Sequence, residues 1–355
     1  MKEYFIVIHI VGAGIAGLTA SLFLIEKGYE VEILEKNEWI KSSACAEGCN
    51  FSSLELLPFN FKPFISKKVD GIKLSFIDKY FYIKMDGVVL ERERLMKKMA
   101  EEIVEKGSKI KFCEKVMKVD DEFIYTKSGK IKYDICIGAD GPLSVTKNYF
   151  GNKYEYKIGC QYEIEYDTSN MNFLEIYFDK KFSSYYSWIF PKENSINAGL
   201  IGKFYKLNEF LRERRIKGNI LKKQAGLIPC FFPRKIAHKK IALIGDSASI
   251  TNPFSLGGIS PAIHAGKILS ENLENLREYE KKVIKKFCNP VLIKGRRAIE
   301  SLSNNEMEIL FKKINGKEFH DIRMKDFIPL LIHPLLIGKV YYISNALIYS
   351  LKFGW

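Results

Sequence analysis

The stretch YFIVIHIVGAGIAGLTASLFLIEKGYEVEILEK, residues 4–36, decides the fold of this protein. It opens with an apolar, β-branched run, residues 4–11, of the kind found in a buried parallel strand. A glycine-rich turn then leads into an Ala/Leu-rich helical segment, residues 18–27, and residues 30–35 have the pattern of a second strand. This order of strand, helix and strand predicts a parallel β-α-β unit at the start of an α/β domain.

The turn carries three glycines in the pattern Gly-x-Gly-x-x-Gly. The first permits a tight turn, the second lets the backbone approach a pyrophosphate, and the third lets the helix pack on the strand. The helix N-terminus favours the phosphate charge, and a carboxylate at the end of the second strand can bond ribose hydroxyls. We therefore predict an ADP-containing dinucleotide, held by Gly12, Ala13, Gly14, Ala16, Gly17, Glu35 and Lys36.

A second glycine-rich stretch, LIGDSASITNPFSLGGISPAIHAG at residues 243–266, distinguishes FAD from NAD. A buried strand ends in an Asp that can bond ribityl hydroxyls, and a glycine pair precedes a helix whose N-terminus can meet the charge of a reduced flavin. NAD would need neither feature so late in the chain. The stretch therefore predicts FAD, with contacts at Gly245, Asp246, Pro253, Gly257, Gly258 and Ile259.

The remaining patterns predict how the chain is organised. We expect antiparallel strands at 69–90 and 155–202, a helix at 92–106, short strands around 109–119 and 122–126, irregular structure at 37–60, helical pieces at 207–224, a strand at 240–245 and a helix at 260–276. The expected fold class is α/β: a Rossmann-like FAD-binding domain (1–68, 91–150, 238–300), an inserted, mainly antiparallel β-sheet substrate domain (69–90, 151–237) and a short C-terminal helical, apolar region (301–355).

With these motifs, the chain resembles the flavoprotein superfamily of para-hydroxybenzoate hydroxylase. The resemblance rests on GAGIAG with Glu35, on the IGADG stretch, and on the Gly-Asp pair with the later proline. It implies flavin contacts at Asp140 and Gly141. It also implies a contact from Arg92, which lies where the family's flavin-contacting arginine is found.

Two narrower motifs resemble those of the geranylgeranyl reductases. The first is Cys-x-x-Gly at residues 45–48, which that family carries near the flavin, and which implies cofactor contacts at Cys45 and Ala46. The second is Tyr-x-x-Trp-x-Phe-Pro followed by Gly199, although Ile201 stands where the family has a further glycine, and Gly202 follows it. The aromatic side chains form either an apolar wall for a prenyl chain or an ordinary sheet core. We predict substrate contacts at Gly48, Tyr185, Trp188, Phe190 and Pro191.

The resemblance implies an FAD-dependent reductase that saturates C=C bonds of an isoprenoid lipid or diphosphate. Cys45 is the candidate catalytic residue, as a thiol that protonates one carbon or gates the site; the alternative is that it is a small buried residue. Two alternatives remain open: a monooxygenase of the same superfamily acting on a hydrophobic substrate, and a non-catalytic flavin-binding lipid or electron-transfer protein. The sequence contains no second Gly-x-Gly-x-x-Gly, so electrons are expected from a protein such as ferredoxin or from NAD(P)H.

Composition sets further limits. A formal charge of +14 predicts a solvated basic surface, an acidic partner or an anionic membrane, and no nucleic-acid motif accompanies it. Seven cysteines without a CxxC pair, and histidines without ligand spacing, predict neither a disulfide framework nor a metal site. No signal peptide is evident, so we expect a cytoplasmic protein, with peripheral membrane attachment as an option. The apolar tail, residues 327–355, is expected to pack on the body or to lie on a membrane surface.

Overall fold

A parallel sheet forms one of the two halves of the molecule. The computed structural model describes residues 6–322 and 334–352. The sheet has six strands in the order β16-β17-β10-β1-β2-β6, all parallel except the edge strand β16. Their bounds are β1 Val7–Val11, β2 Glu30–Leu34, β6 Lys109–Lys111, β10 Ile135–Gly138, β16 Ala237–His238 and β17 Ile241–Leu243. The predicted β-α-β unit is therefore confirmed, although the first residues of its expected opening strand, Tyr4 and Phe5, lie outside the described residues.

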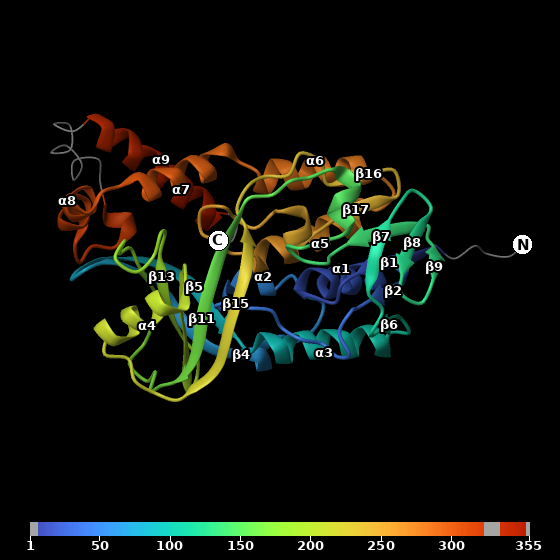
Figure 1. The fold of residues 1–355 in the computed structure, drawn as a ribbon, viewed down its shortest axis with the longest axis horizontal. Helices are drawn as coiled ribbons and strands as arrows, with labels where there is room; N and C mark the ends of the chain where they lie inside the picture. Colours follow the sequence, from blue (N-terminus) through green and yellow to red (C-terminus); the bar gives the residue numbers. More distant parts are fainter. Residues whose placement is uncertain (1–5, 323–333, 353–355) are drawn as a thin grey trace, which may run out of the picture.

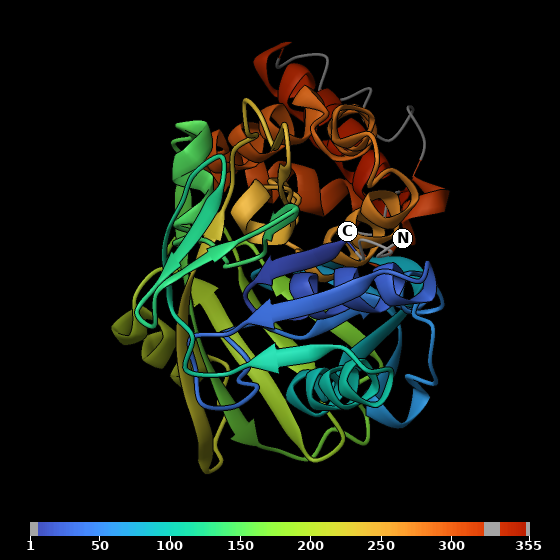
Figure 2. The ribbon, with the colours of Figure 1, turned by 90° about the vertical axis from the view of Figure 1, so that its right-hand side faces the viewer.

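Two layers cover the parallel sheet. Three helices pack on one face in a common core with Ile8, Ile10 and Ile33: α1 (Ile15–Glu26), α3 (Arg92–Glu105) and α5 (Ile259–Glu271). The other face packs against a three-stranded antiparallel sheet of β7 (Val116–Val119), β8 (Phe123–Thr126) and β9 (Lys130–Lys132). Figure 1 shows this small sheet at the right-hand end of the molecule, and Figure 2 views the same end from the front.

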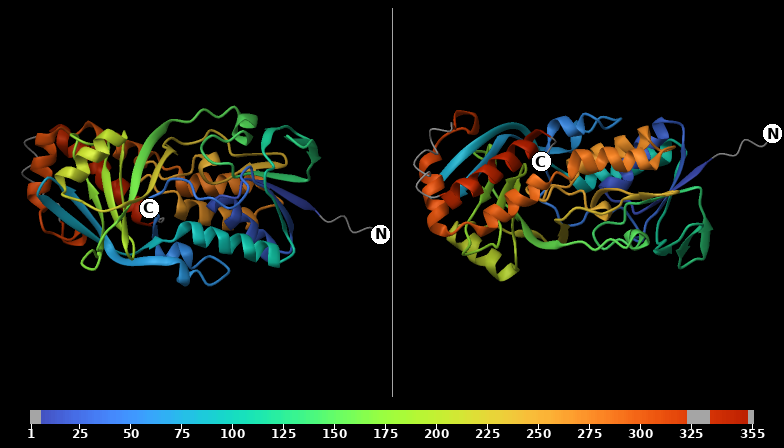
Figure 3. Two further views of the ribbon diagram at one scale, coloured as in Figure 1. Left: turned by 60° about the horizontal axis from the view of Figure 1, so that its bottom comes forward. Right: turned by 90° about the horizontal axis from the view of Figure 1, so that it is seen from above.

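An eight-stranded, mainly antiparallel sheet forms the second half, as expected. Its order is β15-β11-β14-β13-β12-β4-β5-β3, and within it only β12 and β4 pair in parallel. The bounds are β3 Gly48–Asn50, β4 Ile65–Phe76, β5 Lys79–Leu90, β11 Tyr156–Glu165, β12 Phe173–Tyr177, β13 Ser187–Pro191, β14 Ser195–Ile201 and β15 Ile220–Pro229. The helix α4 (Phe204–Glu213) covers one face. The two halves lie next to each other along the long axis (Figure 3).

Helices of the C-terminal part cover the other face of this sheet. They are α7 (Pro290–Ser301), α8 (Asn304–Ile314) and α9 (Pro334–Lys352). The helix α6 (Leu276–Phe287) packs instead with α5 in the core of the parallel-sheet half. α7 and α9 cross closely, because a Cβ on Gly295 would lie 2.3 Å from the Cβ of Ala346. The described part of the apolar tail thus packs on the body. Within the described residues, no helix combines the length and apolar character needed to cross a bilayer.

Short elements complete the description: the helix α2 (Phe51–Leu54) and the 3-10 helices η1 (Lys62–Phe64), η2 (Thr146–Phe150), η3 (Gly245–Ala248) and η4 (Phe319–Asp321). The division of the chain into domains stays a prediction. The sheet topology differs from the predicted division at one point. The strand β3 belongs to residues 1–68, which were predicted as part of the FAD-binding domain, but it pairs with β5 in the antiparallel sheet.

Three local predictions were wrong. Helical structure expected through residue 224 ends at Glu213, and residues 220–229 instead pair with β11 as an edge strand, because long-range pairing outweighs a Lys-rich local pattern. The helix expected to run to residue 276 ends at Glu271, and α6 begins only after Asn275, whose side chain accepts from the backbone N–H of Glu278. The region expected to be irregular contains β3 and α2.

Candidate functional site

The three glycines of the first turn have three different physical roles. Gly12 has φ +101°, and a Cβ there would lie 2.7 Å from the carbonyl oxygen of Ala139. A Cβ on Gly17 would lie 2.0 Å from the Gly12 carbonyl oxygen, so only glycine lets α1 pack on the turn. A Cβ on Gly14 would meet nothing within 4 Å. Gly14 therefore leaves open space at the N-terminus of α1, where the predicted pyrophosphate would approach.

Glu35 closes the turn from the end of β2. Its Oε2 accepts the Ala13 backbone N–H at 2.8 Å, and its Oε1 accepts the backbone and side-chain N–H groups of Asn37 at 2.9 and 2.6 Å. The carboxylate is buried and fixed beside the glycine turn, as an acceptor for ribose hydroxyls requires. Lys36 follows it as an exposed residue.

The second glycine-rich stretch folds against the first. Gly245 has φ +65°, and a Cβ there would lie 2.6 Å from the Cβ of Ala16 in α1. This close approach brings Asp246 and the start of α5 to the side of the dinucleotide turn. The two predicted halves of the cofactor site therefore meet in space, although they are far apart in the sequence.

Asp246 faces the glycine pair at the N-terminus of α5. Its Oδ1 accepts the hydroxyl hydrogen of Thr251 at 2.7 Å, and a Cβ on Gly258, the residue that precedes the helix, would lie 3.4 Å from the same oxygen. Burial raises the pKa of Asp246, while the Thr251 hydrogen bond and Arg92 oppose that shift. The first N–H groups of α5 have no partner within their own helix, as at any helix start, so this end is suited to an electron-rich acceptor.

Two buried polar atoms of the predicted flavin-contacting residues lack a hydrogen-bond partner within the described part of the chain. They are Nε of Arg92 and Oδ1 of Asp140. Arg92 Nη2 donates to the Ser43 carbonyl, and Asp140 Oδ2 accepts the Val145 backbone N–H at 2.7 Å. Gly141 has φ +77° with open space at its Cβ position. These residues fit a bound dinucleotide, because a buried unpaired donor and acceptor favour a ligand that satisfies them.

The remaining predicted cofactor residues line the same region. Pro253 is buried in the loop before α5, and Gly257 accepts the Asn252 backbone N–H at 3.0 Å, which holds that loop closed. Ile259 is buried as the first residue of α5. Ala46 is partly buried against the apolar core on the substrate-sheet side.

Cys45 lies between the cofactor residues and the antiparallel sheet. Its Sγ accepts the Glu47 backbone N–H at 3.3 Å. Burial raises the pKa of the thiol and Glu47 raises it further, whereas Arg92 lowers it, and Asp246 is close enough to contribute. On the other side, Cys45 influences the ionisation of Tyr186. The thiol is therefore within electrostatic reach of both predicted halves of the site, and it is protonated at neutral pH.

The two narrower motifs are in direct contact. A Cβ on Gly48 would lie 2.7 Å from the ring of Phe190, and a Cβ on Gly199 would lie 2.3 Å from the ring of Trp188. Glycine at both positions lets the aromatic rings lie flat on the backbone. Pro191, also buried, ends the strand that carries both rings. The Cys-x-x-Gly loop and the aromatic strand thus form one packed unit.

Tyrosine hydroxyls join this unit to the loop before α5. Tyr185 donates to the carbonyl of Phe254, and Tyr186 donates to that of Ser255 at 2.6 Å. The rings of Tyr185 and Tyr186 are 4.9 Å apart, and Trp188 is 6.0 Å from Tyr186. The structure therefore places the predicted substrate wall next to the predicted flavin loop.

Sequence reasoning missed a set of polar residues behind Cys45. Gln161 donates to the Cys45 carbonyl at 2.8 Å, Asn197 to the Ala46 carbonyl at 3.1 Å, and Lys192 to the Glu47 carboxylate at 3.0 Å. The signal that could have found them is polarity at buried positions of otherwise apolar strands.

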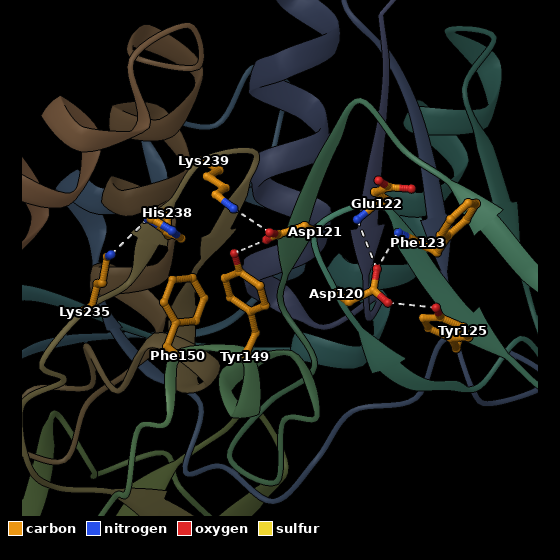
Figure 4. Close-up of a pocket in the computed structure, with 10 residues that line it drawn as sticks. All are labelled: Asp120, Asp121, Glu122, Phe123, Tyr125, Tyr149, Phe150, Lys235, His238 and Lys239. Carbon is orange, nitrogen blue, oxygen red and sulfur yellow. Dashed lines mark hydrogen bonds and ion pairs between the residues drawn. The ribbon is translucent and has the colours of Figure 1, made fainter.

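A groove with a volume of about 830 Å³ lies elsewhere. Its lining residues are Asp120, Asp121, Glu122, Phe123, Tyr125, Tyr149, Phe150, Lys235, His238 and Lys239. Figure 4 shows that both aspartates of the groove have partners within it: Asp121 accepts from Tyr149 and Lys239, and Asp120 accepts from Tyr125. It shares no residue with the motifs above.

One group of possible metal ligands occurs among the described residues. Glu318, His320 and Asp321 place their ligand atoms within 4.8 Å of one another at the surface. These side chains pair with each other and with Lys84, and no predicted site residue is among them.

Comparisons with known proteins agree with this geometry. Residues 10–40 match the family described as NAD(P)-binding Rossmann-like domain. Digeranylgeranylglycerophospholipid reductase 3 of Methanosphaera stadtmanae is 26% identical over 321 residues, 79% of this chain and 81% of that protein. Digeranylgeranylglycerophospholipid reductase of Methanococcus aeolicus is 28% identical over 357 residues, 87% of this chain and 90% of that protein. The predicted resemblance to the geranylgeranyl reductases is confirmed.

Solved structures confirm the fold class. A geranylgeranyl bacteriochlorophyll reductase-like protein from Thermoplasma acidophilum matches with a TM-score of 0.79 at 19% identity, covering 98% of this chain and 99% of that one. A 2-methyl-3-hydroxypyridine-5-carboxylic acid oxygenase matches with a TM-score of 0.69 at 15% identity, covering 86% and 92%. The fold is therefore one that reductase-like proteins and oxygenases share.

Proposed function

We propose that this chain is an FAD-dependent reductase that saturates C=C bonds of an isoprenoid lipid of the digeranylgeranylglycerophospholipid type. The names of its sequence relatives support the substrate class. The position of Cys45 carries the proposal: its loop packs on the aromatic strand through Gly48 and Phe190, and its thiol lies within electrostatic reach of Arg92 and Asp246. A proton donor between a flavin and an apolar wall is the arrangement that reduction of an alkene requires.

The chain's own residues have distinct tasks in this proposal. Gly12 to Gly17 and Glu35 would hold the ADP part of FAD, and Arg92, Asp246 and the glycine pair before α5 would hold the flavin part. Bound FAD in its reduced form supplies the hydride. Tyr185, Tyr186 and Trp188 exclude water from the substrate and position its apolar chain. The Cys45 thiol stays protonated because burial raises its pKa, so Sγ can deliver a proton to the carbon that hydride does not attack.

The electron donor is also part of the proposal. An acidic protein such as ferredoxin suits a chain with a formal charge of +14, and NAD(P)H is the alternative donor. Reduction rates of the bound flavin with each donor, measured anaerobically, distinguish the two.

We also place the protein in the cytoplasm, acting at the membrane surface where its lipid substrate resides. Tyr341 and Ile348 are exposed on α9, 62% and 54% respectively, and Lys352 is exposed at its end. Co-sedimentation with anionic vesicles is expected at low salt and should decrease in Tyr341→Ser/Ile348→Ser. Equal binding of that variant would contradict a role of this helix face.

The deciding experiment is anaerobic. The purified protein is incubated with FAD, dithionite and digeranylgeranylglycerophospholipid, and the lipid is analysed by mass spectrometry. The expected product has gained one H₂ for each double bond reduced. Bound FAD and bound lipid without any H₂ gain would overturn the reductase and leave the non-catalytic carrier. Oxygen incorporation that needs O₂ and NAD(P)H would establish the monooxygenase alternative. That alternative is tested because an oxygenase shares this fold.

A further inference from the structure

Each of the residues 45–48 in the loop that carries Cys45 contacts one side chain from the antiparallel sheet or from the turn after β13. Gln161 of β11 holds the Cys45 carbonyl, and Asn197 of β14 holds the Ala46 carbonyl. Lys192, directly after β13, holds the Glu47 carboxylate, and the Phe190 ring covers Gly48. Three of these anchors are neutral, whereas Lys192 is an ammonium group whose side chain is 3% exposed.

Lys192 joins three parts of the molecule at a single atom. Its Nζ lies 3.0 Å from Glu47 in the thiol loop, 3.1 Å from Glu91 at the start of α3, and 3.3 Å from Glu163 in β11. Glu91 directly precedes Arg92, the predicted flavin contact. Burial disfavours the charged ammonium, but the three carboxylates outweigh it and raise the pKa of Lys192 to about 12. The cation therefore persists in the interior, where an unpaired charge would be very costly.

Glu47 shows why this cation is needed. It is a non-glycine residue in the left-handed region, with φ +67°, and this conformation turns its backbone N–H toward Cys45 Sγ. A residue keeps such a conformation only where its surroundings hold it. The carboxylate of Glu47 is held on one oxygen by Lys192 at 3.0 Å and by Asn197 at 3.3 Å, and Arg92 Nε lies 4.0 Å from its other oxygen.

We propose that Lys192 is a positioning residue for Cys45: by holding Glu47, it fixes the loop that sets the thiol against the aromatic wall. The catalytic consequence rests on the proposed function, while the positioning itself does not. Residues of the antiparallel sheet thereby determine the position of the Cys45 thiol, which lies next to the predicted flavin contacts. Lys192 lies in the β13–β14 turn, so its ion pair with Glu47 links that turn to the loop of Cys45.

The charge at Glu47 adds an electrostatic consequence. The charged or titratable groups that face Cys45 are Arg92, Glu47 and Asp246, together with Cys49 and Tyr186. Glu47→Gln keeps the shape and the hydrogen bond from Asn197 but removes the negative charge. Because Glu47 raises the pKa of the Cys45 thiol, this variant should have a lower thiol pKa than the wild type.

The test measures alkylation of Cys45 by iodoacetamide as a function of pH, read site by site by mass spectrometry in the full-length protein with FAD. It compares the wild type with Lys192→Met, Glu47→Gln and the double variant. Lys73→Met is the matched control, because Lys73 pairs with Glu175 at 3.6 Å elsewhere on the same sheet. The limiting rate at alkaline pH reports access to the thiol, and the midpoint of the profile reports its apparent pKa.

We expect Lys192→Met to raise the limiting alkylation rate at least about fivefold and to lower kcat more than it changes KM, since released loops expose their groups. Glu47→Gln should shift the midpoint to lower pH. The decrease in kcat in the double variant, expressed as a free energy, should be smaller than the sum of the decreases in the two single variants, because both remove the same ion pair. A limiting rate and midpoint equal to those of Lys73→Met in every variant would overturn the proposal. If Lys192→Met does not fold, Glu47→Gln decides through its limiting rate, which should exceed that of Lys73→Met because the same ion pair is removed; an equal limiting rate would overturn the proposal.

The outcomes separate this inference from the proposed function. Changed alkylation in a protein that reduces no lipid would retain the positioning role and refute the reductase. Normal alkylation together with full reductase activity in Lys192→Met would refute the positioning role and retain the reductase.

Discussion

Both the chemistry and the position of Cys45 favour a role as a proton donor. It is partly buried, its thiol pKa is raised by burial, and it lies between the predicted flavin residues and the aromatic strand. A thiol with a raised pKa still carries its proton at neutral pH and so has one to donate, and a positioned general acid typically contributes about 10²–10⁴-fold to a rate. Cys45→Ala should therefore lower the rate of lipid reduction about 100-fold or more, measured anaerobically under single-turnover conditions.

The control for this prediction is Cys113→Ala, because Cys113 is exposed and follows β6, an edge strand of the parallel sheet, outside the aromatic unit that contacts the Cys45 loop. Bound FAD, measured by its visible absorbance, should be the same in both variants. A Cys45→Ala enzyme with an unchanged rate would show that the thiol is a packing residue only.

His264 gives a second prediction at the scale of a residue. Burial, helped by Lys286 and Lys267, lowers its pKa from 6.5 to about 4, and its ring nitrogens lie 3.5 Å from Ser53 Oγ and 3.1 Å from Lys286 Nζ. The unfolded chain binds a proton at this residue below 6.5, and the folded chain does so only below about 4. Stability should therefore fall as the pH decreases through this window.

Urea unfolding midpoints at the two ends of that pH window test this. The wild type should lose stability on acidification, and His264→Gln should lose less, because it removes a group that the unfolded state protonates first. His238→Gln, a substitution at an exposed histidine, is the control. Equal acid sensitivity of His264→Gln and the wild type would contradict the role of His264.

At the scale of the element, the turn between β1 and α1 separates folding from binding. Gly17→Ala puts a Cβ 2.0 Å from the Gly12 carbonyl oxygen, so α1 must shift, at a cost of about 2 kcal/mol or more in the free energy of unfolding. Gly14→Ala meets no protein atom within 4 Å and has an ordinary φ of −75°, so it should change stability by less than about 0.5 kcal/mol.

Flavin binding should nevertheless weaken in Gly14→Ala, because its methyl group occupies the space through which the pyrophosphate approaches. Thermal unfolding of the FAD-free protein and titration with FAD measure the two effects separately. Tight FAD binding by Gly14→Ala would place the pyrophosphate elsewhere.

Elements also show where local pattern reading ends. The strands β1 and β2, the helices α1 and α3 and the start of α5 were predictable because apolar runs, helix-forming residue types and glycine stops are local properties. The strand β15 was not, because its Lys-rich start is compatible with a helix until β11 offers a pairing edge. Likewise, β3 was hidden in a small-residue stretch, since its partner strand β5 is distant in sequence.

At the scale of the whole molecule, the net charge predicts a salt effect. A chain with a formal charge of +14 should attract an acidic electron donor over long distances, and exposed charges are screened as ionic strength rises. The rate of flavin reduction by an acidic ferredoxin should fall about tenfold between low salt and about 0.5 M NaCl. Reduction by a small neutral reductant, followed by the loss of flavin absorbance, should change little. Equal salt dependence for both reductants would exclude a guided encounter.

The sequence by itself determined the dinucleotide turn, the second glycine stretch, the aromatic motif and the cysteine. Each of these depends on residue type and short spacing, which act through local backbone geometry. Only the tertiary structure decided that Gly48 packs on Phe190 and that Gly245 packs on Ala16. It also brought Lys192 and its three carboxylates together from four separate segments of the chain. Such contacts are fixed by close packing and by the need to pair buried charges, and neither can be read from spacing along one chain.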